Sequence, residues 1–335
     1  MLKNQRVVIP TNGGPEVLQL IEEPIPQPAP DEVLIQVLAT GVAHGDLMMR
    51  TGLARSPFQK SPLTPGFEVV GVVKEAGKHV QGIQLNQRVA ALTVTGGYSA
   101  YICLKQDQLV PLPEGIDTDE ATSLVLNYLT AYQMLHRVAK VKAGEMILVH
   151  GAAGGVGTAM LQLGKLAQVD MLGTASVSKH PLLTRLGAVP IDYKQTDFVA
   201  EALKNSPEGI HAVFDGIGGE YFQRSFKTLH KKGRLIGYGF QSSSSKREIL
   251  TSLLKLMSLN LQLSSKKAKF YSIVVESRKK SELLKDDLST LFQLLLEQKI
   301  KPVIQQRFPL SQVQAAHRLM ESGALTGKVI LTVNR

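Results

Sequence analysis

The residues with the clearest chemical purpose are the small ones of Gly151-Ala-Ala-Gly-Gly-Val-Gly157. Counted from Ala152, this segment reads A-x-G-x-x-G, the spacing of a dinucleotide-binding fingerprint. The middle glycine lets the backbone approach a pyrophosphate, and the last one lets the following helix pack closely. The amino terminus of that helix offers unpaired N–H groups and the positive end of its dipole. An ordinary strand-to-helix turn is the alternative, and the surrounding elements must decide between the two.

A second polar group follows the next apolar run, in Gly173-Thr-Ala-Ser-Val-Ser-Lys-His-Pro181. In an NAD site an acidic side chain about 20 residues after the glycines holds the ribose hydroxyls. This segment contains no Asp or Glu, but it contains Ser176 and Lys179. A lysine at the start of a helix opposes the helix dipole unless it binds an anion. We therefore predict that both side chains contact a 2′-phosphate and that the cofactor is NADP(H); an incidental surface lysine is the alternative.

Other candidate residues lie in turns that follow predicted strands. His44 and Asp46 belong to G-V-A-H-G-D, and we treat them as pocket candidates only, because a lone histidine in a loop is more often structural. The segments Phe214–Gly219 and Gly233–Gly239 end in glycines and are expected to line the nicotinamide half of the site. Cys103 is the single cysteine, which excludes an intramolecular disulfide and a zinc site built from several thiolates.

The elements that must position these residues fall into two classes. Residues 1 to 125 contain short β-type runs broken by glycine and proline, which predict a mainly β, barrel-like domain. An amphipathic helix is predicted from Asp119 to Val138. After it, strand-like and helical stretches alternate from Met146 to Tyr238, as in a doubly wound parallel sheet. The glycine turn follows the first of these strands, which favours dinucleotide binding over an ordinary turn.

Composition sets the broad class of the protein. A chain of 335 residues with 44% hydrophobic and 20% charged residues is long enough for two globular domains. No apolar run reaches membrane-spanning length and the first residues do not resemble a secretion signal, so a cytoplasmic location is expected. Much of the excess in the formal charge of +10 lies between Lys246 and Lys280, and it is not interleaved with the aromatic pattern of an RNA-binding sheet. This pattern disfavours nucleic acid and favours a solvated surface, with a weak acidic partner or a membrane surface as the alternative.

Several motifs together resemble the quinone oxidoreductase branch of the medium-chain dehydrogenase/reductase superfamily. They are G-A-A-G-G-V-G, N-Y-L-T-A-Y from Asn127, D-G-I-G-G-E from Asp215, T-G-K-V-I-L near the end and G-G-P-E-V-L from Gly13. Within this branch, G-T-A-S-V-S-K-H, L-V-L-N-Y-L-T-A-Y and D-L-M-M-R-T-G-L are most similar to the vesicle amine transport protein subgroup. The resemblance covers essentially the whole chain.

The resemblance implies an α/β protein in which a Rossmann domain is inserted into a mainly β, GroES-like catalytic domain. The implied boundaries are 1–125 with 300–335 for the catalytic domain and 126–299 for the NADP-binding domain. The cofactor is expected in the cleft between them, and two such chains are expected to pair the edges of their Rossmann sheets in a homodimer. The residues expected to contact the cofactor are Thr130, Ala153, Gly154, Gly155, Val156, Ser176, Lys179, Tyr193, Ile217, Gly239 and Phe240.

Two departures from the family pattern concern the substrate pocket. Zinc-dependent members place a cysteine third in G-V-C-H-x-D and a histidine in G-H-E, where this chain has Ala43 and Phe67. Zinc is therefore excluded on ligand count. Typical quinone reductases have an asparagine and a tyrosine in G-V-N-x-x-D-x-Y, where this chain has Ala43 and Met48. The pocket is expected to be more apolar and altered in shape.

The leading hypothesis is zinc-independent hydride transfer from NADPH to a quinone or to the activated double bond of an enone or enal. Without a metal, positioning and hydrogen bonds to the developing oxyanion must supply the catalysis. Asn127 and Tyr128 are the expected polar groups, although Tyr128 is equally interpretable as a core aromatic. The alternative is an NADPH-binding interaction or membrane-associated protein with little catalytic activity.

Overall fold

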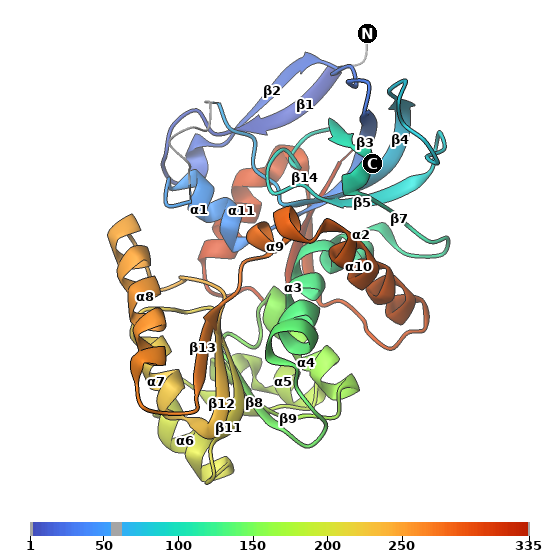
Figure 1. The fold of residues 1–335 in the computed structure, drawn as a ribbon. Helices are drawn as coiled ribbons and strands as arrows, with labels where there is room; N and C mark the ends of the chain where they lie inside the picture. Colours follow the sequence, from blue (N-terminus) through green and yellow to red (C-terminus); the bar gives the residue numbers. More distant parts are fainter. Residues whose placement is uncertain (1–2, 55–61, 334–335) are drawn as a thin grey trace. The chain divides into compact units, whose positions relative to one another are not determined.

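The computed structural model describes residues 3–54 and 62–333, which include every residue predicted to form the site. Contacts between residues divide the chain into two units. Unit 1 comprises Met1–Leu129 and Val274–Arg335, and unit 2 comprises Thr130–Ile273 (Figure 1). Both ends of the chain thus belong to one unit, and a continuous central segment forms the other.

The main sheet of unit 1 has seven strands, in the order β14-β15-β3-β4-β5-β7 with β6 also paired to β3. Its ladders are antiparallel except for the parallel pair β14 and β15. The apolar runs predicted in the amino-terminal part form most of these strands. The strands are β3 Glu32–Val42, β4 Glu68–Ala76, β5 Arg88–Leu92, β6 Tyr101–Lys105, β7 Leu109–Pro111, β14 Ile304–Pro309 and β15 Lys328–Thr332.

Smaller elements complete unit 1. A separate hairpin pairs β1 Lys3–Val8 with β2 Gln19–Pro24. The helices are η1 Pro15–Val17, α1 His44–Arg50, η2 Gln106–Gln108, α2 Thr118–Ser123, η3 Leu124–Tyr128, α9 Ile273–Lys279, α10 Ser281–Leu296, η7 Leu310–Gln312 and α11 Val313–Glu321.

Unit 2 contains a six-stranded parallel sheet in the order β10-β9-β8-β11-β12-β13. Figure 1 shows α4 and α5 on one side of this sheet and α7 and α8 on the other. The strands are β8 Met146–Val149, β9 Asp170–Ala175, β10 Val189–Asp192, β11 Ile210–Asp215, β12 Leu229–Gly237 and β13 Lys267–Phe270. The helices are α3 Leu129–Tyr132, η4 Gln133–Ala139, α4 Gly155–Leu166, η5 Val177–Lys179, α5 His180–Arg185, α6 Phe198–Asn205, α7 Glu220–Lys227, α8 Lys246–Ser258 and η6 Leu259–Leu261.

The long helix predicted before the sheet differs from expectation in its burial. It runs continuously as α2, η3, α3 and η4, with π-type geometry in η3 and η4. From Ala121 to Leu135 every residue except Tyr132 is buried. The helix is therefore an element of the interior rather than an amphipathic surface helix, because its small and apolar residues are distributed all round it.

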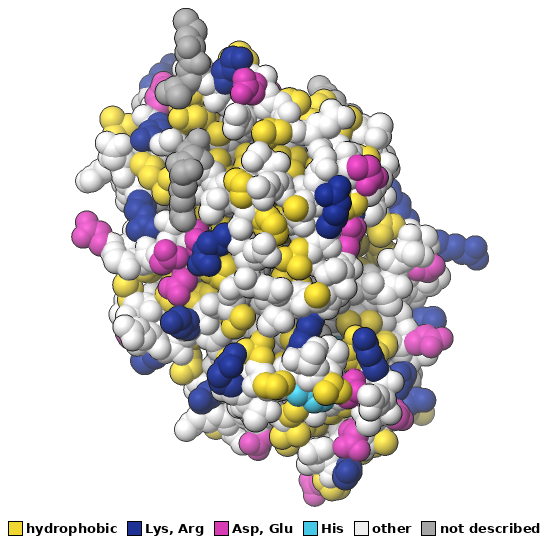
Figure 2. All heavy atoms as spheres, turned by 180° about the vertical axis from the view of Figure 1, so that it is seen from behind, with side chains coloured by type: hydrophobic (Ala, Val, Ile, Leu, Met, Phe, Trp, Pro, Cys, Tyr) yellow, Lys and Arg dark blue, Asp and Glu magenta, His cyan; other side chains and the backbone are white. Residues whose placement is uncertain are grey.

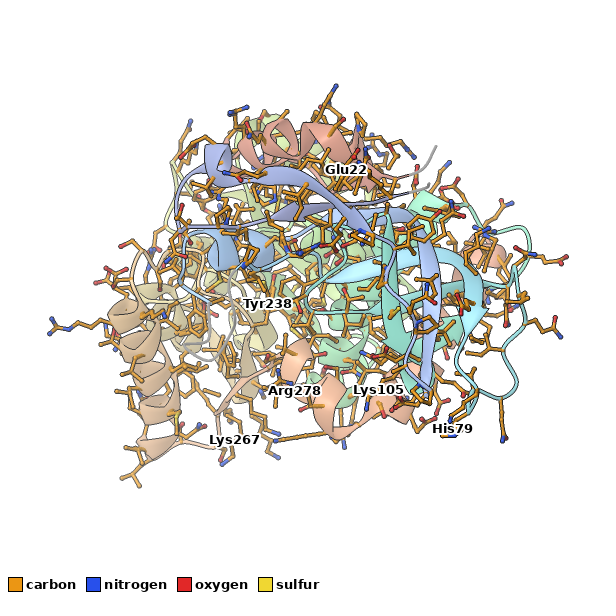
Figure 3. The ribbon with its side chains drawn as sticks, turned by 90° about the horizontal axis from the view of Figure 1, so that it is seen from above. Glu22, His79, Lys105, Tyr238, Lys267 and Arg278 are labelled. Carbon is orange, nitrogen blue, oxygen red and sulfur yellow. The ribbon has the colours of Figure 1, made fainter. Side chains whose placement is uncertain are left out.

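The edge strand β13 was absent from the predicted elements. Its sequence Lys267-Ala-Lys-Phe270 buries only Ala268 against the sheet, so no apolar run marks it. Lys267 lies at the margin of the molecule in Figure 3. On the face shown in Figure 2, Lys and Arg side chains stand singly among acidic and uncharged ones. That face carries no continuous basic stripe.

The contact-based division differs from the predicted domain boundaries. Residues 274–299, which the prediction groups with the Rossmann domain, lie in unit 1. Helix α10 supplies the reason, since it packs on η3 and β7 of that unit through an apolar side that includes Leu284 and Leu288. Within the described ranges, none of the helices combines the length and the hydrophobicity needed to cross a membrane.

Candidate functional site

The glycine turn of unit 2 has the geometry that the fingerprint predicts. Gly151 follows β8 with a φ of 63°, a backbone conformation that residues other than glycine rarely adopt. A Cβ on Gly157 would lie 2.5 Å from the Gly151 carbonyl oxygen, whereas one on Gly154 would meet only that oxygen, at 3.3 Å. Gly157 is therefore needed for close packing, and Gly154 leaves open space beside the turn.

The amino terminus of α4 faces this open space with glycine as its cap. Gly154 has extended backbone angles and, lacking a side chain, leaves the first N–H groups of the helix uncovered. Gly155 and Val156 are partly exposed, while Ala153 is buried. The turn also lies where the strand order reverses, since β8 sits between β9 and β11. An anion placed here meets free N–H groups and the positive end of the helix dipole.

Two further turns follow β11 and β12 at the same edge of the sheet, and they are in contact. A Cβ on Gly239 would lie 2.5 Å from the Gly216 carbonyl oxygen. The Ser242 N–H donates to the Ile217 carbonyl over 2.9 Å. Of the predicted cofactor contacts here, Ile217 and Gly239 are partly exposed. Phe240 is instead 8% exposed and belongs to the core of the unit, where its ring stacks on the more exposed ring of Phe270.

The end of β9 carries the residues predicted to hold a 2′-phosphate. Ser176 caps the short η5 and Lys179 is its last residue; the Ser176 Oγ lies 3.5 Å from the Ser178 Oγ. Burial, and then the neighbouring Lys194, lower the pKa of the Lys179 ammonium. Tyr193, another predicted contact, is 44% exposed beside Lys194. Lys194 is a second cation near Lys179, and the sequence pattern did not point to it.

The predicted residues on the long helix are buried. Asn127 and Tyr128 lie in η3 of unit 1 with exposed fractions of 7% and 2%. Thr130 lies in α3 of unit 2 and is 6% exposed. Among the described residues its hydroxyl has no hydrogen-bond partner, which is unusual for a buried polar atom. A missing partner at this hydroxyl agrees with its predicted role as a ligand contact.

Asp46 of unit 1 is the centre of a buried hydrogen-bonded cluster. Its carboxylate accepts the Ala43 N–H at 2.9 Å, the Gly66 N–H at 2.8 Å and the Tyr98 hydroxyl at 3.1 Å. Burial, and then the nearby Glu68, raise its pKa to about 7 despite these donors. Through these hydrogen bonds, Asp46 links the start of α1 to the segments of Gly66 and Tyr98. Its exposed fraction is 0%, so its side chain is not open to solvent.

The cluster continues from Tyr98 into α11. The Tyr98 hydroxyl lies 3.2 Å from the Nε2 of His317, whose Nδ1 lies 3.3 Å from a guanidinium nitrogen of Arg50. Arg50 in turn pairs with Glu321. Since Arg50 can only donate, the neutral His317 donates from Nε2 to Tyr98, and Tyr98 donates to Asp46. No local spacing pointed to these residues, because residues 98 and 317 lie far apart in the sequence. His44, at the start of α1, is partly buried, and that burial lowers its pKa.

The positions where zinc-dependent relatives hold their metal do not fit zinc. Ala43 and Phe67 are 8% and 7% exposed, and neither offers a ligand atom. A Cβ on Gly45 would lie 2.5 Å from the Phe67 ring, so the ring fills this space. The neighbouring carboxylate of Glu68 pairs with the ammonium of Lys328. The described residues contain no group of three or more His, Cys, Asp or Glu side chains placed to hold a metal ion.

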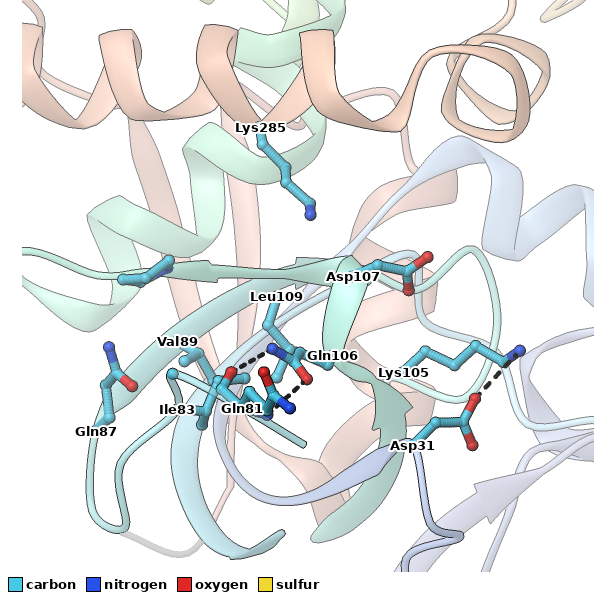
Figure 4. Close-up of a pocket in the computed structure, with 12 residues that line it drawn as sticks. Asp31, Gln81, Ile83, Gln87, Val89, Lys105, Gln106, Asp107, Leu109 and Lys285 are labelled. Carbon is cyan, nitrogen blue, oxygen red and sulfur yellow. Dashed lines mark hydrogen bonds and ion pairs between the residues drawn. The ribbon is translucent and has the colours of Figure 1, made fainter. Parts of the chain in front are cut away.

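Two cavities of unit 1 are not lined by any of the predicted site residues. The first, of about 500 Å³, lies between β5, β7 and α10 (Figure 4). Its polar groups are largely paired, as in the hydrogen bonds between Gln81 and Gln106 and the ion pair of Lys105 with Asp31. The second, of about 510 Å³, is lined by the ends of β5 and by α10. Neither includes a residue predicted to bind the cofactor.

Comparison with known proteins agrees with this architecture. Residues 29–114 match the family described as alcohol dehydrogenase GroES-like domain, and residues 186–331 match zinc-binding dehydrogenase. The synaptic vesicle membrane protein VAT-1 homolog of Rattus norvegicus is 33% identical over 95% of this chain and 81% of its own length. The chain belongs to the medium-chain dehydrogenase/reductase superfamily.

Solved structures of this superfamily share the fold. The quinone oxidoreductase of Escherichia coli, solved with NADPH, is 28% identical with a TM-score of 0.87, covering 98% of this chain and 99% of that one. The CurK enoyl reductase is 27% identical with a TM-score of 0.85, covering 98% and 99%. The predicted superfamily, its quinone oxidoreductase and VAT-1 relatives and the fold of a GroES-like domain with a Rossmann-like parallel sheet are confirmed. The chain is an oxidoreductase.

Proposed function

We propose that the protein is a zinc-independent, NADP(H)-dependent oxidoreductase that transfers hydride to a quinone or to the activated double bond of an enone or enal. The observation that carries this proposal is the open glycine turn beneath the amino terminus of α4, at the point where the strand order reverses. The NADPH bound to the Escherichia coli relative and the enoyl reductase activity named for CurK support it.

The corner around Ser176 supports NADP(H) over NAD(H). Lys179 and Lys194 interact electrostatically there, so this part of unit 2 brings two positive charges close together. No acidic side chain follows β9 to hold a free 2′-hydroxyl. A 2′-phosphate would neutralise both lysines and accept hydrogen bonds from the serines.

When bound, NADPH supplies the hydride, and the chain must orient it and exclude water. The α4 amino terminus binds the pyrophosphate, and Thr130, Tyr193, Ile217 and Gly239 are proposed to fix the two ends of the cofactor. Because Ala43 and Phe67 offer no ligand atom for zinc, hydrogen-bond donors must stabilise negative charge on the acceptor. Asn127 and Tyr128 stay our proposals for those donors.

The cofactor assignment is tested by fluorescence titration of the purified protein with NADPH and NADH. Lys179→Ala should weaken NADPH binding about tenfold and leave NADH binding unchanged, because only NADPH carries the additional phosphate. Lys204→Ala is the matched control, since Lys204 is an exposed lysine on α6 of the same unit. Equal affinity for both cofactors, unaffected by Lys179→Ala, would contradict the assignment.

The acceptor is tested by following NADPH oxidation with a panel of quinones, enones and enals. The apolar Ala43 predicts a preference for acceptors with few polar substituents beside the reacting group. An Asn127→Ala variant should lower kcat more than it raises KM if the amide stabilises the developing charge. No oxidation of NADPH by any acceptor, with NADPH binding intact, would leave the second function below as the better account.

The second candidate function is binding to an anionic membrane surface through α8. Its side chains Leu250, Leu254 and Met257, with Leu261 beyond, recur at helical spacing and are 58%, 56%, 66% and 83% exposed. Such an exposed apolar stripe is uncommon on a soluble monomer. Lys246, Arg247 and Lys255 lie on the same helix, so its charge complements anionic lipid. The proposed location is then cytoplasmic with a membrane-bound fraction.

Sedimentation with phosphatidylcholine vesicles, with and without phosphatidylserine, tests this surface. Binding should require phosphatidylserine, fall with added salt and weaken at least about tenfold in Leu254→Glu. Leu203→Glu, on α6, is the control at another exposed leucine. A change of oligomeric state in Leu254→Glu without any vesicle binding would instead assign the stripe to a homodimer, which we otherwise propose to form through the β13 edge.

A further inference from the structure

A second buried polar cluster lies directly beneath the glycine turn of unit 2. Four side chains from three adjacent strand ends and from α7 form it, with exposed fractions of 3% or less: His150, Thr174, Asp215 and Ser225. His150 immediately precedes Gly151, and Asp215 is the last residue of β11. No individual role was predicted for any of the four from the sequence, although Asp215 lies in the segment Phe214–Gly219 that was expected to line the nicotinamide half of the site.

The four side chains form one continuous chain of hydrogen bonds. The Thr174 Oγ1 lies 3.1 Å from the His150 Nδ1, and the His150 Nε2 lies 3.0 Å from the Ser225 Oγ. Ser225 continues to the Asp215 Oδ2 over 2.8 Å. Both ends of this chain terminate on backbone N–H groups of the proposed cofactor turns.

At the first end, the Gly151 N–H donates to the Thr174 Oγ1 over 3.2 Å. At the other end, the Asp215 Oδ1 accepts the Ile217 N–H at 2.9 Å and the Gly218 N–H at 3.1 Å. The chain therefore joins the turn after β8 to the turn after β11.

Counting protons gives every bond a single direction. The Asp215 carboxylate can only accept, so the one proton of Ser225 is donated to it. The Ser225 oxygen must then accept a proton from the His150 Nε2. The His150 Nδ1, left with its lone pair, accepts from the Thr174 hydroxyl, and the Thr174 oxygen accepts from Gly151. Each polar proton is used once, which requires a neutral imidazole protonated on Nε2; burial, which lowers the pKa of His150, agrees with this form.

The surroundings restrict the imidazole to this role. The rings of Phe198 and Tyr221 meet it edge-on, with centroids 4.6 and 5.4 Å away. The Arg224 guanidinium lies over Phe198, 4.4 Å from the ring centroid. A phenylalanine at position 150 would fill the same space but leave the hydroxyls of Thr174 and Ser225 without a partner, which is costly inside a protein. Position 150 therefore requires the two ring nitrogens of histidine as well as a side chain of this volume.

We infer that His150, held as the Nε2-protonated tautomer between Thr174 and Ser225, is a positioning residue that fixes the two cofactor turns relative to each other. The inference rests on the proposed function, because the turns matter only if a dinucleotide binds across them. The His150 imidazole touches neither the cofactor nor the acceptor; it acts through the backbone of Gly151 and of Ile217. A ligand that spans both turns then meets N–H groups and carbonyls already in place.

The test compares two substitutions at one position in the full chain. Thr174→Val keeps the shape of the side chain and removes the hydroxyl, whereas Thr174→Ser keeps the hydroxyl. We expect NADPH to bind about tenfold more weakly to Thr174→Val and within about twofold of wild type to Thr174→Ser. Ser225→Ala should weaken binding similarly, and the double variant Thr174→Val/Ser225→Ala should lose less than the product of the two effects.

A spectroscopic measurement separates this inference from the proposed function. The ¹⁵N chemical shifts of His150 in the cofactor-free protein should report a protonated Nε2 and an unprotonated Nδ1 at neutral pH. The amide protons of Gly151 and Ile217 should exchange faster in Ser225→Ala than in wild type. If wild-type protein fails to bind NADPH, the proposed function fails. The two measurements would still decide whether His150 has the inferred tautomer and fixes the two turns.

Three results would overturn the inferred positioning role of His150. They are a proton on the His150 Nδ1 at neutral pH, equal NADPH affinity in Thr174→Val and Thr174→Ser, and purely multiplicative effects in the double variant. If Thr174→Val does not fold, the nitrogen shifts and the Ser225→Ala comparison decide in its place.

Discussion

Burial acts in opposite directions on Asp46 and His317, two side chains of one hydrogen-bonded cluster. It raises the pKa of the Asp46 carboxyl from 3.8 to about 7, with a further contribution from Glu68. It lowers the pKa of the His317 imidazole from 6.5 to about 3, with a further contribution from Arg50. Between pH 3.8 and about 7, the folded protein therefore binds a proton at Asp46 more tightly than the unfolded chain does. Between about pH 3 and 6.5, the folded protein excludes a proton from His317 that the unfolded chain binds.

The two groups should give opposite pH slopes of stability. The contribution of Asp46 is lost as pH rises from 3.8 to about 7, and that of His317 is lost as pH falls from 6.5 to about 3. Urea unfolding should thus show stability rising with pH between about pH 4 and 6.5 in Asp46→Asn, and falling with pH in His317→Gln, each by up to about 1.4 kcal/mol per pH unit. The same slope in both variants would contradict this account of the cluster.

Alanine substitutions at two glycines of the fingerprint should have different effects, one mainly on stability and the other mainly on NADPH binding. Gly157→Ala places a Cβ 2.5 Å from the Gly151 oxygen and should lower the free energy of unfolding by about 1–3 kcal/mol. Gly154→Ala meets no atom closer than 3.3 Å, so stability should change little while NADPH binding weakens about tenfold. Chemical denaturation and NADPH titration of both variants check this, and a stable Gly157→Ala variant that binds NADPH normally would be the contrary result.

The glycine turn could be found from sequence because its three small residues lie within six positions and each has a local steric reason. The partners of Asp46 could not, since Tyr98 and His317 reach it from distant parts of the chain. His150 was also missed, although it adjoins the fingerprint, because its function depends on Thr174 and Ser225 being brought beside it by the sheet. Local spacing predicts backbone requirements, whereas buried polar networks depend on tertiary structure.

At the scale of elements, one ion pair links strands that do not pair directly. Glu68 of β4 and Lys328 of β15 meet beside Gly41 of β3, which lies between them in the sheet. Their exposed fractions are 0% and 2%, so each charge depends on the other. A Cβ on Gly41 would lie within 2.2 Å of both side chains, which explains the glycine at this position.

Breaking this pair should be costly, and breaking a surface pair should not. Lys328→Met leaves the Glu68 carboxylate buried alone and should reduce the free energy of unfolding by about 3–5 kcal/mol. The Glu68→Gln/Lys328→Met double variant should be less affected than the sum of the single variants. Lys299→Met removes the exposed pair with Glu297 and should cost under about 1 kcal/mol. Equal losses for Lys328→Met and Lys299→Met would show that burial is not what matters here.

Most strands were predictable, and the exceptions have a physical reason. The inner parallel strands of unit 2, β8, β9 and β11, are buried on both faces and appear in the sequence as short apolar runs. Strand β13 is an edge strand that buries Ala268 alone, so periodicity could not mark it. The burial of the helix from Asp119 to Val138 was also missed, because small residues such as Ala121 and Ser123 are compatible with either environment.

At the scale of the whole molecule, cofactor binding should stabilise the two units unequally. NADPH at about 100 times its dissociation constant should add about 2.7 kcal/mol to the free energy of unfolding of the state that binds it. Hydrogen exchange should slow mainly in residues 146–239, which carry the proposed turns, with smaller changes in the strands of unit 1. NADH at the same concentration is the control. Slowing confined to unit 1 would place the cofactor elsewhere.

The assignment of both chain ends to unit 1 has a consequence for synthesis on the ribosome. Unit 2 is continuous, so its sheet can form once residue 273 has emerged. The sheet of unit 1 must wait for β15, which pairs with β3 although almost three hundred residues separate them. During that interval β3 has an open edge and the charge of Glu68 lacks Lys328. The nascent chain therefore passes through a stage in which its Rossmann unit is complete while its first-made strands are still open to aggregation or to chaperones.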